Sequence, residues 1–292
     1  MQNVTPVAIA ALVVELAPAV AFGCAADRIA RSLARWPAAV RVGFPALFVV
    51  PYGMVSLSQH IFQWTWFGLY ALLPVAIAWL LIRAAVADPE QQGDWRDWFI
   101  LLVLGLAVDL RWFDSAWPNG LRALNELVLV DAGLYGFLGI RRLSGTGFDF
   151  HFKWSDWRTG LRELVFFAPI VLVLGLVLGF IHPHGNRPGV GGALLRWVGI
   201  FFFTAVPEEL YFRAWLQNLL ERRVGRGAAL VIASVLFGLS HFNKRAAHFN
   251  WRYVLLATIA GIFYGRAWRE KRRVPASTIT HASVDWIWGL WF

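Results

Sequence analysis

The chain is built from apolar blocks of about 17–22 residues, which is long enough for a helix to cross the ~30 Å hydrocarbon core of a bilayer. Charged residues, glycines and prolines separate these blocks. The composition agrees, since 58% of the 292 residues are hydrophobic and only 15% are charged, against about 25% charged in soluble domains. The sequence therefore excludes a soluble globular domain. It predicts an all-α fold, a polytopic bundle of transmembrane helices.

Candidate spans in the sequence predict about eight to ten membrane crossings. They lie at about 6–24, 42–58, 64–82, 97–110, 123–140, 163–181, 193–212, 228–243, 252–268 and 275–292. The block 6–24 is longer than the apolar core of a signal peptide, and no basic residue precedes it. We therefore expect a retained span at this position and not a cleaved signal.

The longest polar stretch, 141–162, divides the chain into two halves. We expect an N-terminal membrane region of five spans at 1–140, whose role the sequence does not indicate, a cytoplasmic linker at 141–162 and a second membrane domain at 163–292. Basic residues gather in alternate connections, which places the N-terminus outside the cytoplasm. The Arg-rich, Lys-poor composition is typical of GC-rich bacterial genomes, so we expect a multi-pass protein of a bacterial cytoplasmic membrane.

The net charge of +9 would suggest a nucleic-acid partner in a soluble protein. Here the basic residues lie between apolar blocks and report orientation in the bilayer, so no nucleic-acid partner is expected. The single cysteine, Cys24, excludes a disulfide framework within one chain. The oligomeric state is not indicated.

A charged side chain at the bilayer centre costs ~2.5–3.5 kcal/mol on insertion scales, so ionisable residues inside spans are functional candidates. Two adjacent carboxylates, Glu208 and Glu209, follow an aromatic run, and Arg213 lies four residues after Glu209. On a helix this is an ion-pair spacing, whereas Glu208 points about 100° away. Glu209 and Arg213 are therefore expected to be structural and supporting residues. Glu208 is left available as a general base.

Two further polar sites follow on later spans. His241 ends an apolar block one turn after Phe237, and His281 and Asp285 lie four apart on one helix face. Glu208, His241, His281 and Asp285 thus come from three consecutive helices that can converge, and the sequence predicts that they form one site.

The depths of these residues test that prediction. If the chain turns at Gly225, then Glu208, 17 residues before it, and His241, 16 residues after it, lie at matching depth. His281 is only six residues past Pro275, which leaves it about 15 Å too shallow at 1.5 Å per residue. We expect the segment 213–227 to extend beyond the membrane as a helical hairpin, which would remove the mismatch and leave the site open to the cytoplasm.

The pattern resembles the CAAX protease and bacteriocin-processing family of intramembrane endopeptidases, which includes the Ras-converting prenyl-protein endopeptidase. That family has Glu-Glu-x-x-x-Arg, Phe-x-x-x-His and His-x-x-x-Asn or Asp. This chain has the same three motifs in order, beginning at Glu208, Phe237 and His281. The resemblance covers roughly 193–292. It identifies the second membrane domain as an intramembrane peptidase domain similar to those of CAAX proteases.

The resemblance implies a glutamic-type endopeptidase in which Glu208 activates a water and His241 helps to hold it. His281 and residue 285 would stabilise the oxyanion. Asp285 departs from asparagine, because aspartate donates a hydrogen bond only when it is protonated. Three interpretations stay open: Asp285 is protonated, it fixes a histidine tautomer, or His281 acts alone.

The implied substrate is a membrane-anchored or lipid-modified protein or peptide, a sorting-signal tail or a bacteriocin-like leader, and no cofactor is implied. Zinc held by Glu208, His241 and His281 is an alternative mechanism, because two histidines and a carboxylate suffice for catalytic zinc. The alternative function is a non-catalytic transporter, immunity or scaffolding protein whose polar residues line a pathway or fix helix packing.

Overall fold

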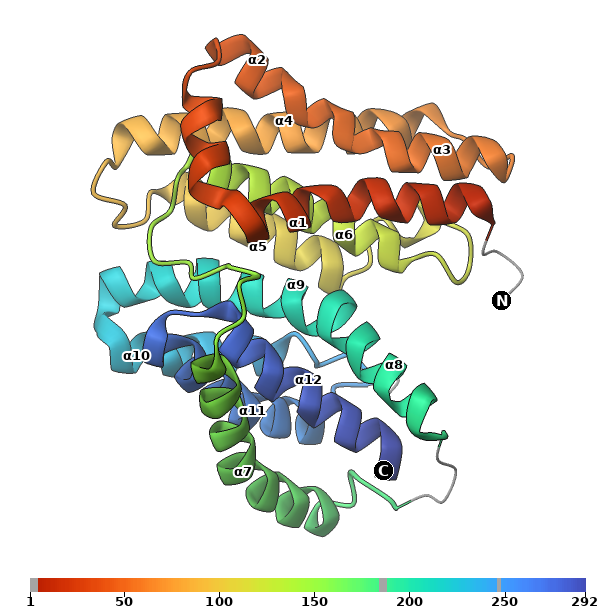
Figure 1. Cartoon of the computed structure of the whole chain (residues 1–292), viewed down its shortest axis with the longest axis vertical. Helices are drawn as coiled ribbons and strands as arrows, with labels where there is room; N and C mark the ends of the chain where they lie inside the picture. Colours follow the sequence, from red (N-terminus) through yellow and green to blue (C-terminus); the bar gives the residue numbers. More distant parts are fainter. Residues whose placement is uncertain (1–4, 184–187, 246–247) are drawn as a thin grey trace. The chain divides into compact units, whose positions relative to one another are not determined.

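The computed structural model describes residues 5–183, 188–245 and 248–292. Over these ranges the chain forms helices and no β-strand, which confirms the expected all-helical fold. The chain divides into two compact units, Met1–Ser144 and Gly145–Phe292. Figure 1 follows the helices of each unit from red at the N-terminus to blue at the C-terminus.

The first unit packs around α6 and its π-helical continuation η3, most of whose side chains are buried. α1 lies against α3 and α6, and α4 lies against α5 and α6. α1 bends at Ala25, whose φ of −151° is not helical, so the predicted span 6–24 corresponds to its first arm. The elements are α1 (Pro6–Ala34), α2 (Ala38–Gly43), η1 (Phe44–Val49), α3 (Val50–Ser58), α4 (Trp64–Ala87), α5 (Trp95–Asp109), η2 (Asp114–Ala116), α6 (Ala123–Leu134) and η3 (Tyr135–Ile140).

The second unit packs around α12, which contacts α7, α8 and α11. Its first ten residues are all buried, as expected for a helix that other helices cover on every side. The elements are α7 (Trp154–Val177), α8 (Val190–Ile200), η4 (Phe201–Ala205), α9 (Val206–Glu209), η5 (Leu210–Gln217), α10 (Asn218–Leu239), α11 (Trp251–Lys271) and α12 (Val274–Trp291).

Six helical segments in the described ranges are long and apolar enough to cross a membrane. The last is 50 residues long and contains the predicted span 193–212 and the first twelve residues, 228–239, of the predicted span 228–243. α5, α11 and α12 occupy further predicted spans but are not among the six, so eight to ten crossings stay a prediction. The six are Pro6–Ala34, Ala38–Ser58, Trp64–Ala87, Ala123–Ile140, Trp154–Val177 and Val190–Leu239.

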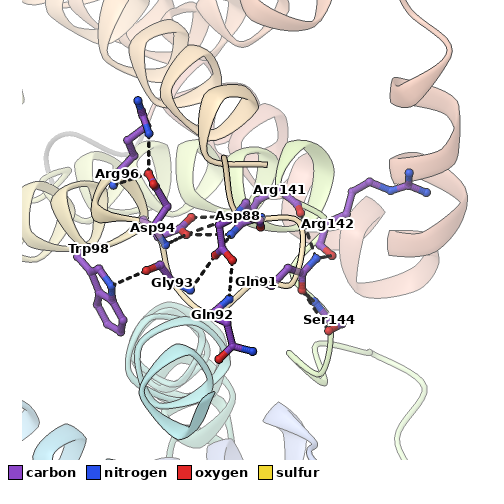
Figure 2. A network of polar contacts seen from close by, with 11 residues as sticks. Asp88, Gln91, Gln92, Gly93, Asp94, Arg96, Trp98, Arg141, Arg142 and Ser144 are labelled. Carbon is purple, nitrogen blue, oxygen red and sulfur yellow. Dashed lines mark hydrogen bonds and ion pairs between the residues drawn. The ribbon is translucent and has the colours of Figure 1, made fainter. Parts of the chain in front are cut away.

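A buried arginine joins three segments of the first unit (Figure 2). The Arg141 guanidinium, 1% exposed, donates to the Asp97 carboxylate at 3.0 Å and to the Asp88 carboxylate at 2.7 Å. Burial opposes ionisation of the Asp88 carboxyl, but hydrogen bonds from the backbone N–H groups of Gln92 and Gly93, together with Arg141, hold its pKa below the usual value. The network fixes the end of α4 and the start of α5 to the residue that follows η3.

A second arginine, Arg273, joins the start of α12 to the first turn of α7 and to the segment before it. It donates to Asp156 at 2.6 Å and to Asp149 at 2.9 Å. Burial would raise the pKa of the Asp149 carboxyl, but hydrogen bonds from Arg273 and His151 outweigh burial and lower it to about 2. Gly147, with a φ of +70°, lies so close to Arg272 that a Cβ would be 1.8 Å from the Arg272 carbonyl oxygen. Only glycine fits there.

The expected hairpin at Gly225 is confirmed. Gly225 has a φ of +77°, which breaks the helix. The Phe212 and Phe237 rings, 13 residues before it and 12 after it, are 5.0 Å apart. Two antiparallel arms therefore run back from this turn, and the level of Glu208 on one arm corresponds to that of His241 on the other.

Candidate active site

The two adjacent glutamates lie on α9, a single turn of α-helix between the π-helical segments η4 and η5. Pro207 lies in the first turn of α9 and has no N–H to donate to the preceding turn. π-helical segments are rare and concentrate at functional sites, because the extra residue re-aims the side chains that follow. The helix is therefore irregular at the position where the sequence places its candidate base.

Glu209 is buried and is held by two partners. Its Oε2 accepts a hydrogen bond from Nε of Arg213 at 3.1 Å, and its Oε1 lies 2.9 Å from Nδ1 of His281. All three side chains are buried. The ion pair between Glu209 and Arg213 predicted from their spacing is confirmed, and Glu209 also orients His281.

The structure does not have the depth mismatch expected for straight helices, because Glu209 and His281 are in contact. Arg272, which caps the end of α11 two residues before α12 begins, donates to Asn218 at 3.0 Å. Glu209 lies nine residues before Asn218 and His281 lies nine residues after Arg272, so both rise equally from this contact. The hairpin around Gly225 extends past the start of α12.

Glu208 is the less constrained carboxylate. Its side chain is 24% exposed, and Oε2 has no hydrogen-bond partner among the described residues. The nearest charged atoms are Nε2 of His281, 3.8 Å from Oε2, and Nζ of Lys244, 4.0 Å from Oε1. Both separations exceed a hydrogen bond. Lys244 follows the arm of the hairpin that begins at Gly225, at its end away from that turn.

The two histidines have assigned orientations. Nδ1 of His241 donates to the Phe237 carbonyl oxygen at 2.8 Å, since a carbonyl oxygen only accepts. Its Nε2 is therefore the ring nitrogen left for a water or substrate. His281 directs Nδ1 to Glu209 and Nε2 toward Glu208 and Asp285, the latter at 3.6 Å.

The Phe237 ring joins the two parts of the site. Its centroid is 4.9 Å from the His241 ring and 5.6 Å from the His281 ring, and the Arg213 guanidinium lies 5.3 Å from it. The structure thus brings Glu208, Glu209, Arg213, His281 and Asp285 into one chain of contacts and connects His241 to it through an aromatic ring.

An apolar cavity of about 190 Å³ opens beside these groups. His241, His281 and Asp285 form part of its wall, and the rest is largely apolar and comes mainly from α7, α11 and α12. Such a cavity holds an apolar group next to the polar residues, which is the usual arrangement of a ligand site.

Residues 190–287 match the family model of Type II CAAX prenyl endopeptidase Rce1-like proteins. The match confirms the resemblance expected from the sequence over about a third of the chain. It includes all six site residues proposed from the motifs. No curated protein and no solved structure matches the chain. The match to a CAAX endopeptidase family, together with the apolar helices, indicates an integral membrane protein related to peptidases.

Several residues that line this CAAX-peptidase-like site lie outside the three sequence motifs and were not predicted. The Tyr264 ring stacks on His281 at 4.5 Å, and the Tyr253 ring lies 4.7 Å from His241. Both tyrosines line the cavity, as do Ala257 and Ala260. The spacing of these four residues along α11 follows one helical face, which is the signal that could have identified them. Lys244 also lies at the site, 4.0 Å from Glu208, and belongs to none of the three motifs.

Zinc held by Glu208, His241 and His281 is the alternative to a metal-free site. Among the described residues there is no group of three or more His, Cys, Asp or Glu side chains arranged to hold a metal ion. Zinc binding at this CAAX-peptidase-like site stays an untested alternative.

Proposed function

We propose that this protein is an intramembrane endopeptidase that cuts a membrane-anchored or lipid-modified protein, with Glu208 as the base that activates water. The observation that carries the proposal is the difference between the two adjacent glutamates. Glu209 is buried and its carboxylate is hydrogen-bonded to both Arg213 and His281. Glu208 is partly exposed and has an oxygen without a hydrogen-bond partner among the described residues. A carboxylate that is not used for structure is available to take a proton.

The proposed reaction begins with a water held between Glu208 and Nε2 of His241. Glu208 takes one proton from this water, and the water oxygen attacks the carbonyl carbon of the peptide bond. The tetrahedral intermediate carries an oxyanion, which an N–H group from the ring of His281 would stabilise. Collapse breaks the C–N bond, and Glu208 returns the proton to the leaving amine.

Asp285 supports this scheme through its negative charge and not as a hydrogen-bond donor. Its Oδ2 lies 3.6 Å from Nε2 of His281, so the carboxylate charge is next to the ring. We propose that Asp285 and Glu209 together keep His281 protonated at both nitrogens. The asparagine of the family pattern would donate to the oxyanion directly, whereas here His281 would supply that hydrogen bond.

The substrate is proposed from the cavity and the family. An apolar cavity of about 190 Å³ next to His281 supports a substrate that brings an apolar side chain or part of a lipid into the site. We propose the bacterial cytoplasmic membrane as the location, from the Arg-rich composition.

The Glu208→Gln variant tests the proposal. It keeps the size of the side chain and removes the base, so substrate cleavage should fall by about 10²–10⁴-fold, the contribution of a general base. Mass spectrometry of the membrane proteome, with wild-type protein or the variant in the same cells, would identify new peptide termini that depend on Glu208.

The matched control is Glu90→Gln, which changes an exposed glutamate of the first unit. It should leave every cleavage product in place. Equal products from Glu208→Gln and wild type, with both proteins folded in detergent, would contradict a peptidase and favour the non-catalytic alternative.

A further inference from the structure

Two basic residues lie in the turn between His241 and the start of α11. Nζ of Lys244 is 4.0 Å from Oε1 of Glu208, and the Arg245 guanidinium lies 4.1 Å from the centroid of the Trp288 ring. Trp288 lines the cavity. One cation is therefore beside the proposed base and the other is at the wall of the cavity.

Hydrogen bonds connect the described residues at the two ends of this turn. The Asn250 side chain donates to the Lys244 carbonyl oxygen at 3.0 Å, and the Asn250 backbone N–H donates to the Phe242 carbonyl oxygen at 2.8 Å. Arg245 has a φ of 59°, a left-handed conformation that is uncommon outside glycine. Such conformations persist where the surrounding structure fixes them, and they concentrate at binding sites.

The hydrogen-bonding capacity of both cations is unused. Neither side chain forms a hydrogen bond with the described residues, and the distance from Lys244 to Glu208 exceeds one. Lys244 is half-buried and Arg245 is exposed. An ammonium and a guanidinium with open donors match a carboxylate, which a guanidinium binds through two parallel hydrogen bonds.

We propose that Lys244 and Arg245 bind a carboxylate of the substrate close to the bond that is cut. This inference rests on the proposed peptidase function. A carboxylate about 2.8 Å from Nζ of Lys244 lies within about 7 Å of the Glu208 carboxylate, which is about two residues of extended chain. The anion is the C-terminal carboxylate of the substrate or an acidic side chain at such a position, and both make Lys244 and Arg245 specificity-determining residues.

The test uses the full chain in phosphatidylethanolamine and phosphatidylglycerol vesicles. The probes are S-farnesyl-cysteine peptides with one to five residues after the cysteine, each made as a C-terminal acid and as an amide. A second series carries Asp or Asn within those residues. We expect a carboxylate to raise kcat/KM at least 10-fold, mainly through a lower KM, in the series that carries the recognised anion.

The variants assign this preference to the two cations. Lys244→Gln with Arg245→Gln should bring the ratio between carboxylate and amide probes to about 1, whereas Lys244→Arg should retain the preference. Lys271→Gln, an exposed lysine outside the cavity, should leave the ratio unchanged. Wild type and Lys271→Gln should cleave the amide probes at similar kcat. Folding of the Lys244 and Arg245 variants is checked separately, by SDS-induced unfolding followed by tryptophan fluorescence, which should match that of wild type.

The outcomes separate this inference from the function on which it rests. A preference for the acid terminus identifies the C-terminal carboxylate, and a preference for Asp over Asn identifies a side chain. If wild type cleaves all probes at one rate, or the preference survives in the double variant, the inference is wrong and the peptidase stands. If no probe is cleaved and Glu208→Gln behaves like wild type, the proposed function fails and this inference with it.

Discussion

Each unit buries an arginine that pairs with a carboxylate, but the two arginines, Arg141 and Arg213, are used differently. In the first unit all three guanidinium nitrogens of Arg141 form hydrogen bonds, to Asp88 and Asp97. In the second unit Arg213 forms one, from Nε to Glu209, and its two terminal nitrogens have no partner among the described residues. Buried polar groups are normally satisfied, so the exceptions point to function.

The difference indicates what each network does. A saturated arginine joins segments and leaves no group available for chemistry. Arg213 neutralises Glu209 and lies beside the Phe237 ring, which also touches both site histidines. The unsatisfied network is the one next to the cavity and the partly exposed Glu208. Local rules that a structure breaks at one place and keeps elsewhere mark that place as a functional site.

The largest stability loss is expected from Arg141→Met. The substitution keeps the approximate length of the side chain but leaves the buried Asp97 carboxylate without its cation, which costs about 3–5 kcal/mol. SDS-induced unfolding of the detergent-solubilised protein, followed by tryptophan fluorescence, would measure the loss. The control is Arg142→Met, because the neighbouring Arg142 side chain is exposed. A similar loss in both variants would mean that the network in Figure 2 contributes little.

Arg213→Met should lose less stability and more activity. Glu209 keeps its hydrogen bond with His281, so the unfolding free energy should fall by about 1–3 kcal/mol, the cost of one lost charged hydrogen bond. Glu209 would then shift toward His281 and alter its orientation, which should reduce cleavage on the order of 10- to 100-fold, as loss of an outer partner of a functional histidine does.

The same two assays that serve Glu208→Gln and Arg141→Met would check this. Arg213→Lys should recover part of the activity, since it restores the charge but not the planar donor group. A stability loss in Arg213→Met that exceeds the loss in Arg141→Met would overturn the contrast between the two units.

Much of this contrast could be predicted from the sequence, and the reasons for the remainder are physical. Spacing on a helix is a local property, so the pair of Glu209 and Arg213 and the turn at Gly225 followed from residue positions alone. The Arg141 network could not be predicted in this way. Its partners are 44 and 53 positions away in the sequence, and no helical or strand periodicity connects residues so far apart. The position of Lys244 beside Glu208 depends on how the turn after α10 folds back, which no motif records.

A third arginine, Arg273, should behave like Arg141 on a smaller scale, and Asp149→Asn tests this. The pKa of the Asp149 carboxyl is about 2 in the folded protein against an ordinary value of 3.8. Because folding lowers this pKa, the ionised carboxyl stabilises the folded state at every pH above about 4. That contribution is lost as the pH falls from about 4 toward about 2. Wild type should therefore be slightly more stable than Asp149→Asn at neutral pH, and the stabilities of the two proteins should converge near pH 2.

Unfolding followed by tryptophan fluorescence between pH 6 and pH 2 would measure the difference, with Glu90→Gln as a control for the loss of an exposed carboxyl. Because Arg273 also binds Asp156 at 2.6 Å, the variant should stay folded. A difference that stays constant over the whole pH range would mean that Asp149 acts through packing and not through its charge, and that Arg273 resembles neither of the other two arginines.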